Sequence, residues 1–263
     1  MGKIITINSQ KGGSGKTTTA QNLAASLSIK GNKCLLVDLD PQANLTLASL
    51  EYLDTDYTIY ELLKGNCSFD DAVQVNEYYD IIPSYISLSK ADHEFSRAGK
   101  EFLLRNALEP VKDKYDYIII DTPASFGILS INSLVASDYV VIPMEQSFYA
   151  LQGLDHLFDT IKDIQERLNK KLKIMGILLV KYTEKPAINR LLKELMDRFI
   201  KRNRIRLFET FIRESSYINK AQILQTNVVE YSPQCKASKD YMKLAHEVEG
   251  ENIPDFKPAM GCY

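Results

Sequence analysis

A glycine-rich segment near the N-terminus contains the residue types that hold phosphate groups. Residues 9–18 read SQKGGSGKTT and lie between an apolar run, Lys3 to Asn8, and a helical stretch, Thr17 to Ile29. Glycines let backbone N–H groups converge on anionic oxygens, and the N-terminus of the following helix adds the positive end of its dipole. Lys16 would reach the β- and γ-phosphates of a nucleotide, and the Thr17 hydroxyl would bind Mg²⁺. The segment therefore predicts a nucleotide site.

The segment departs from the strict phosphate-loop pattern, G-x-x-x-x-G-K-[ST], because the first glycine of that pattern would fall on Gln10. A bare Gly-Lys-Thr tripeptide is more often a surface turn. Three glycines within the four residues ahead of Lys16, with a strand before and a helix after, favour the phosphate site over that alternative. The predicted contacts to the nucleotide come from Lys11, Gly12, Gly13, Ser14, Gly15, Lys16, Thr17 and Thr18.

Two further motifs place aspartates at the ends of apolar strands. Asp38 closes the run Cys34 to Asp38 and is followed by Asp40, and Asp121 closes the run Tyr117 to Asp121. An isolated aspartate at a strand end is more often a helix cap or a turn former. Here all three motifs follow predicted buried strands, and a doubly wound sheet forms its sites at the carboxyl ends of its strands. We therefore expect the three motifs to form one site.

Short β-branched apolar runs alternate with helical stretches along the chain. Continuous apolarity is typical of strands that are buried on both faces of a parallel sheet. The expected strands are Lys3 to Asn8, Cys34 to Asp38, Tyr79 to Pro83, Tyr117 to Asp121, Tyr139 to Pro143 and Ile174 to Val180. The expected helices, in which apolar residues recur at spacings of three and four, are Thr17 to Ile29, Ile59 to Lys64, Glu101 to Val111, Leu151 to Leu168 and Ala187 to Lys201.

This succession predicts an α/β fold with a single, doubly wound, mostly parallel β-sheet and helices on both faces. Residues 1–250 are expected to form one domain, because no linker or internal repeat interrupts them. Residues 251–263 contain two prolines and a glycine, and are expected to form a loose C-terminal tail.

The composition is that of an ordinary globular protein, with 263 residues, 32 Lys and Arg, 34 Asp and Glu, and 45% hydrophobic residues. It excludes collagen, low-complexity disorder and a disulfide scaffold. The four cysteines are too far apart for a CxxC pair or a zinc knuckle, which favours reduced thiols and a cytoplasmic location. No stretch approaches the roughly 18 apolar residues that span a bilayer.

The net charge of −2 conceals an uneven distribution. Residues 160–220 hold 16 Lys and Arg against 7 Asp and Glu, a net of +9, whereas the rest of the chain has a net of −11. Such a segment suits DNA phosphates, and without a base-reading motif the binding would be largely independent of sequence. For any single residue, solvated surface is the alternative. The predicted DNA contacts are Lys181, Lys185, Arg190, Lys201, Arg202, Arg204, Arg206 and Arg213, with Lys193 and Arg198 as further candidates.

The segment Lys11 to Thr17, KGGSGKT, resembles the deviant Walker A motif, KGGxGK[ST], of the ParA/MinD family of P-loop ATPases. The run Val37 to Asn44, VDLDPQAN, resembles the switch motif of that family, and Ile118 to Pro123, IIIDTP, resembles its Walker B motif. Less specific matches extend the resemblance over about Lys3 to Val248. It implies a P-loop NTPase fold, Mg²⁺-dependent ATP hydrolysis that is weak unless a partner stimulates it, and an ATP-bound sandwich dimer.

The resemblance also implies roles for individual residues. Lys11 would reach across the dimer to the phosphates of the other subunit, Lys16 would stabilise charge on the phosphates, and Asp40 would orient the attacking water. The Mg²⁺ site would comprise Thr17, Asp38 and Asp121, with Asp121 acting through water. One departure concerns the base, since residues 212–215, IRES, stand where relatives read I-P-x-N near the adenine ring.

Branches of this family differ in what they act on. The tail lacks the amphipathic membrane helix of the MinD branch, residues 122–135 lack the cysteines of the iron-protein branch, and the single Tyr263 is not the tyrosine cluster of the kinase branch. The basic segment favours the DNA-partitioning branch. This implies a nucleoid-associated ATPase whose dimer binds non-specific DNA, a ParB-like centromere-binding partner, and no stable membrane association. A MinD-like positioning or regulatory ATPase acting on a protein or membrane cargo, and an ATP-driven filament, remain the alternatives.

Overall fold

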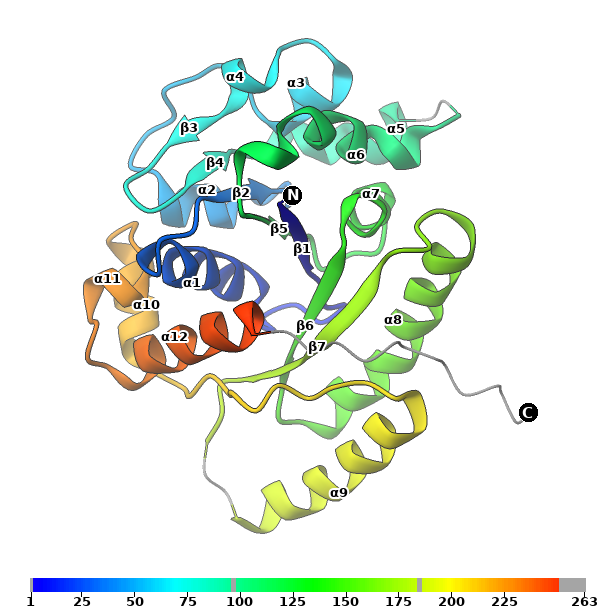
Figure 1. Cartoon of the computed structure of the whole chain (residues 1–263), viewed down its shortest axis with the longest axis vertical. Coiled ribbons are helices and arrows are strands. Elements are labelled where there is room, and N and C mark those ends of the chain that lie inside the picture. Colours follow the sequence, from blue (N-terminus) through cyan, green and yellow to red (C-terminus); the bar gives the residue numbers. More distant parts are fainter. Residues whose placement is uncertain (1, 96–97, 184–185, 251–263) are drawn as a thin grey trace.

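One seven-stranded sheet forms the centre of the molecule in the computed structural model, which describes residues 2–95, 98–183 and 186–250 (Figure 1). The strand order is β3-β4-β2-β5-β1-β6-β7. All neighbouring strands run parallel except β3, which is antiparallel to β4. The bounds are Lys3–Ile7 for β1, Cys34–Asp38 for β2, Gln74–Val75 for β3, Asp80–Ile82 for β4, Tyr117–Asp121 for β5, Tyr139–Glu145 for β6 and Lys173–Val180 for β7.

Helices cover both faces of this sheet, as the sequence predicts (Figure 1). Successive strand residues point to opposite faces, so Ile5 and Ile7 join one apolar cluster and Ile4 joins another. The first cluster lies under α1 (Lys16–Ile29), α10 (Ser216–Ile223), α11 (Val228–Tyr231) and α12 (Lys236–Glu249). The opposite face is covered by α3 (Ile59–Lys64), α6 (Leu103–Leu108), α7 (Ile128–Ala136), α8 (Phe148–Arg167) and α9 (Pro186–Asn203).

Several expected elements differ in detail. The predicted helix Glu101 to Val111 is an α-helix only over α6, with 3₁₀ turns at Lys100–Phe102 and Glu109–Lys114. Pro110 explains the change after Leu108, because proline lacks an N–H donor and its ring clashes with the preceding helical turn. Sequence analysis also missed the short edge strand β3 and the helices α7, α10, α11 and α12, as well as the short helices α2 (Asn44–Ser49), α4 (Phe69–Ala72) and α5 (Ala91–Glu94).

An irregular segment continues the sheet beyond β7. Its backbone bonds to β7 at Ile177, which donates to the Arg206 carbonyl at 2.9 Å, and Ile212 donates to the Leu179 carbonyl at 2.8 Å. These bonds carry residues 212–215 to the carboxyl end of β7, beside the loop that follows β1. The predicted tail, residues 251–263, lies outside the described residues. Within the described part of the chain, no helix is long and apolar enough to cross a membrane.

Candidate nucleotide site

The loop between β1 and α1 has the backbone shape of a phosphate cradle. Gly13 and Gly15 have φ values of +74° and +78°, in the left-handed region that glycine adopts without a Cβ clash. Gly15 is the N-cap of α1, and no side chain caps the helix there. The N-terminal N–H groups of α1 therefore face the loop without a side-chain acceptor, as an anion site requires.

Lys16, the first residue of α1, carries a nearly buried ammonium group, with 7% of the residue exposed. Burial lowers the pKa of this group, while attraction to the carboxylates of Asp121 and Asp40 opposes the shift. A buried cation is stable only with anions close by. A phosphate group in the loop would be a further anionic partner for Lys16.

Asp38 and Asp121 lie side by side at the carboxyl ends of two neighbouring strands. They are register partners on β2 and β5, and both are fully buried. Burial raises the pKa of Asp38 to about 6, although hydrogen bonds from Thr46 and from the Asp40 backbone partly lower it. Burial and the neighbouring Asp38 raise the pKa of Asp121 well above its usual range, although Thr17 and Lys16 partly lower it. Two carboxylates this close need a cation if both are to be ionised.

The oxygens of these two aspartates differ in how they are satisfied. Asp38 accepts from the Asp40 N–H at 3.1 Å, from the Thr46 N–H at 2.8 Å and from the Thr46 hydroxyl at 2.7 Å. Asp121 Oδ1 accepts from the Thr122 N–H at 3.1 Å, but its Oδ2 is buried without a hydrogen-bond partner. Asp121 therefore offers the free oxygen for a metal, and Asp38 holds the chain that follows β2.

This donor set fits Mg²⁺ bound together with a nucleotide. Among residues 2–95, 98–183 and 186–250, no group of three or more His, Cys, Asp or Glu side chains could hold a metal alone. Mg²⁺ usually takes one or two protein oxygens and completes its octahedron with phosphates and water. Asp121 Oδ2, which has no hydrogen-bond partner, and the adjacent Thr17 hydroxyl would provide these protein oxygens.

Asp40 is the more accessible carboxylate of the site. Its Oδ1 accepts from the Gln42 N–H at 2.9 Å, and its carbonyl accepts from the Ser84 hydroxyl at 2.7 Å. Three residues after Asp40, Ala43 has a φ of +54° and caps α2. The half-buried Asp40 is thus fixed at the mouth of the site by its own turn, where it is able to contact a bound water.

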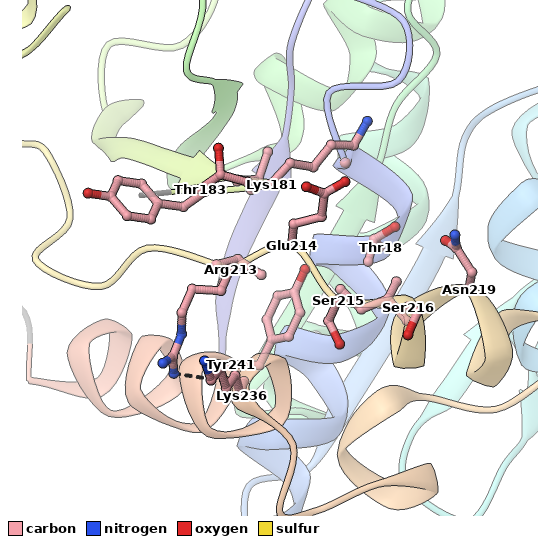
Figure 2. A pocket seen from close by; sticks show the side chains of 15 residues that line it. Thr18, Lys181, Thr183, Arg213, Glu214, Ser215, Ser216, Asn219, Lys236 and Tyr241 are labelled. Carbon is pink, nitrogen blue, oxygen red and sulfur yellow. Dashed lines mark hydrogen bonds between the residues drawn. The ribbon is translucent and has the colours of Figure 1, made fainter. Parts of the chain in front are cut away.

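A cavity of about 870 Å³ opens beside the loop and α1 (Figure 2). Its wall includes Thr18, residues 180–183 and residues 212–216, so the IRES segment lies on a cavity beside the phosphate loop and α1. Arg213 turns away toward α12, as Figure 2 shows, and its Nε donates to Asp240 at 2.8 Å. On the other wall, the ring of Tyr182 packs on Phe211 with 4.1 Å between centroids. The cavity has the size and mixed lining of a nucleoside site.

Three residues at this site were missed by sequence analysis. Tyr182 and Asn219 line the cavity, and Glu145, at the end of β6, contacts the side chain of Lys11. An aromatic residue directly after a buried strand was the available signal for Tyr182. Asn219 and Glu145 belong to no motif, so only the fold reveals them.

The predicted DNA contacts fall into distinct groups in the structure. Lys201, Arg202 and Arg204 are exposed at the end of α9, together with Arg198. By contrast, Arg206 pairs with Glu247, Arg213 pairs with Asp240, and Lys181 donates to Glu145 at 2.7 Å. Lys185 lies outside the described residues, and the side chains of Arg190 and Lys193 are not described. The α9 end therefore carries a cluster of exposed cations from the predicted basic surface.

Known proteins resemble this chain over nearly its whole length. A family model for an AAA domain matches residues 2–174. The sporulation initiation inhibitor protein Soj of Bacillus subtilis is 40% identical over 252 residues, which cover 94% of this chain and 98% of the relative. The chromosome partitioning protein ParA of Myxococcus xanthus is 35% identical over 258 residues, which cover 97% of this chain and 90% of the relative.

Solved structures share the fold. Cobyrinic acid a,c-diamide synthase from Mycobacterium smegmatis, with bound ATP analog and magnesium, superposes with a TM-score of 0.84 at 28% identity and covers 98% of this chain and 100% of that one. The septum site-determining protein MinD from Pyrococcus horikoshii, complexed with Mg-ADP, has a TM-score of 0.78 at 27% identity and covers 95% and 96%. The described sheet and its helices thus form a fold that occurs with Mg²⁺ and adenine nucleotides in both of these proteins.

Proposed function

This chain belongs to the AAA-domain family of P-loop ATPases, in its ParA/MinD branch, and from that premise we propose that it is a DNA-partitioning ATPase. Its ATP-bound dimer binds non-specific DNA, and hydrolysis, stimulated by a ParB-like centromere-binding partner, releases the DNA. The observation that carries the proposal is the buried charge cluster of Lys16, Asp38 and Asp121 at the end of a glycine-rich loop, in a chain similar to Soj and ParA over more than nine-tenths of its length.

ATP and Mg²⁺ are the proposed cofactors. The loop from Lys11 to Thr18 surrounds the phosphates, and Lys16 neutralises the β- and γ-phosphate oxygens. Thr17 and Asp121 hold Mg²⁺, while Asp38 fixes Thr46 and the Asp40 backbone in place. Mg²⁺, when bound, adds positive charge that offsets the developing charge on the phosphates.

Hydrolysis needs only positioning and electrostatic stabilisation from this chain. Asp40 orients a water for in-line attack on the γ-phosphate. Lys16 stabilises the charge that develops on the phosphate oxygens. Lys11 does the same from the other subunit of a sandwich dimer, so that ATP binding and dimerisation are coupled. Turnover is slow until the stimulating partner completes this arrangement.

The exposed cations at the end of α9 form the proposed DNA surface. Lys201, Arg202 and Arg204 come from a segment of the sequence with a net charge of +9. Contacts to phosphates give affinity without sequence information. A dimer carries two such surfaces, and their simultaneous use strengthens binding without any new contact. DNA binding would place the protein at the nucleoid.

Retention on non-specific DNA tests this proposal. The protein is measured with ATP, ADP and no nucleotide at rising salt, and we expect retention only with ATP and a steep loss as salt increases. Retention that is absent, or equal in all three states, would contradict the proposal. Flotation with lipid vesicles is the matched assay for a MinD-like membrane cargo, and ATP-dependent flotation without DNA retention would favour that alternative.

A further inference from the structure

Two lysines from distant parts of the chain share one carboxylate beside the phosphate loop. Lys11 Nζ lies 3.0 Å from Glu145 Oε2, and Lys181 Nζ lies 2.7 Å from Glu145 Oε1. Lys181 also donates to the Gly13 carbonyl at 2.8 Å. The loop, the end of β6 and the residue after β7 are therefore linked through one glutamate.

The backbone indicates that this arrangement is specific. Lys181 has a φ of +50°, a left-handed conformation that a residue with a Cβ adopts only where the surroundings enforce it. In that conformation its side chain points back to the loop, as Figure 2 shows. The Glu145 side chain is the least exposed of the three, at 25% against 46% for Lys11 and 52% for Lys181.

The electrostatics agree with the geometry. Burial alone would raise the pKa of Glu145, but its hydrogen bonds to Lys181 and Lys11 outweigh burial, and the pKa lies below its usual value. Glu145 is therefore ionised at neutral pH and attracts both ammonium groups. Glu145, Lys11 and Ser14 also line one cavity of about 360 Å³ against the start of α8.

This contact conflicts with the proposed task of Lys11. A lysine that reaches the phosphates of a second subunit cannot at the same time keep its ammonium 3.0 Å from a carboxylate of its own subunit. Dimerisation must break the Lys11–Glu145 pair, whereas Lys181 is able to stay and neutralise Glu145. The energy of this pair is then part of the equilibrium between monomer and dimer.

We infer that Glu145 is a positioning residue that holds Lys11 within its own subunit and thereby opposes ATP-dependent dimerisation, while Lys181 weakens this hold by sharing the carboxylate. The inference rests on the proposed role of Lys11 across the dimer. Glu145 and Lys181 then have opposite effects on the equilibrium between monomer and dimer. Removing the glutamate favours the dimer, and removing Lys181 favours the monomer.

The test measures the dimer dissociation constant by sedimentation with Mg²⁺ and a non-hydrolysable ATP analogue, without DNA. Exposed ion pairs are weak, and a dimer breaks two of them, so Glu145→Gln is expected to tighten the dimer by about 2- to 30-fold. The difference from wild type should shrink as salt screens the pair. Glu166→Gln, which removes an exposed carboxylate at the far end of α8, is the matched control and should leave the constant unchanged.

Lys181→Met tests the opposite effect on the dimer dissociation constant. It is expected to loosen the dimer in the wild-type background and to have no such effect when Glu145 is already Gln, because the two residues then no longer share a contact. ADP affinity, measured on the monomer, checks that the nucleotide cavity is intact. A purely structural role for Glu145 would change the melting temperature but not the dimer dissociation constant, and that result would overturn the inference. A larger dissociation constant for Glu145→Gln than for wild type would overturn it as well.

Lys11→Ala separates this inference from the proposed function. If Lys11→Ala dimerises with the analogue as well as wild type does, the proposed role of Lys11 across the dimer is wrong. If Lys11→Ala stays monomeric while Glu145→Gln dimerises like wild type, the role across the dimer holds and only the restraint by Glu145 fails.

Discussion

The nucleotide site and the basic surface proposed for DNA use charge in opposite ways. At the nucleotide end, Lys16, Asp38 and Asp121 are buried together, and burial shifts the pKa of each of them. At the basic end, Lys201, Arg202 and Arg204 are exposed to solvent. Buried charges must be matched atom by atom, whereas exposed charges act through their number and are screened by salt. A single substitution should therefore have a large effect on nucleotide binding or turnover at the first end. At the second end, each substitution should lower DNA affinity only in part.

The largest effect is expected for Lys16→Ala. It removes the only ammonium group that the buried cluster supplies to the β- and γ-phosphates, so we expect loss of measurable nucleotide binding in titration calorimetry. Circular dichroism on the same sample checks that the fold is retained. Binding within a few-fold of wild type would show that the buried cluster is not the phosphate site.

Asp40→Ala should affect turnover and not binding. Asp40 is half-buried and held by its own turn, so its loss leaves the loop and Asp121 in place. Positioning of a reacting water is worth about 10²- to 10⁴-fold in rate. We expect phosphate release to fall by that factor while ATP affinity and the dimer persist. An equal loss of nucleotide affinity in Asp40→Ala and Lys16→Ala would remove Asp40 from this role.

Joint replacement of Lys201, Arg202 and Arg204 by Ala should weaken DNA binding by degrees. Each phosphate contact contributes about −0.9 to the slope of log affinity against log salt, so the slope should become shallower by up to about 3 per subunit. The control is Lys90→Ala with Lys114→Ala. Both lysines are exposed and lie outside the basic segment, Lys90 after β4 and Lys114 before β5. If both variants lower the slope equally, charge number alone matters and no DNA surface lies at α9.

The smallest effect is a pH dependence of Mg-nucleotide binding. The folded pKa of Asp38 is about 6, raised by burial from its ordinary value of 3.8. Its contribution to stability is therefore full below about pH 3.8 and is lost as the pH rises through about 6. Mg²⁺ held at Asp121 would stabilise the ionised form of the neighbouring Asp38, so its binding should release this proton. Affinity should therefore rise with pH by up to tenfold per unit below 6 and then level off.

Calorimetry in buffers of different ionisation enthalpy counts the protons released. Because nucleotide phosphates titrate in the same range, the informative quantity is the difference between wild type and Asp38→Asn. Wild type should release more protons near pH 5 to 6 than the variant does. Identical proton release in both would show that Asp38 is already ionised before Mg²⁺ binds.

Sequence patterns are sufficient to predict a strand or a loop where the residues that determine it are adjacent in the chain. The strands Cys34–Asp38 and Tyr117–Asp121 have the predicted bounds, because a buried parallel strand leaves a continuous apolar run. The phosphate loop is predicted for the same reason, since its glycines, Lys16 and Thr17 are contiguous. The contact of Lys11 with Glu145 joins residues 134 apart in the sequence, and it depends on the strand order that sets β6 beside β1.

The basic segment shows the limit of counting charges. Arg206 and Arg213 contribute to the net of +9, yet their guanidinium groups are paired with Glu247 and Asp240 on α12. α12 lies outside the basic segment, so the count could not include these partners. Whether a cation is exposed or paired is decided by packing between distant elements, which the local sequence does not specify.

The central claim is that the buried nucleotide site controls the exposed DNA surface. The most direct measurement compares the DNA affinity of Asp40→Ala saturated with Mg-ATP with that of the same variant saturated with Mg-ADP, at one fixed salt concentration. Because this variant should keep ATP unhydrolysed, we predict at least tenfold tighter binding with ATP, and no decay of the complex with time. Equal affinity in the two states would contradict the account.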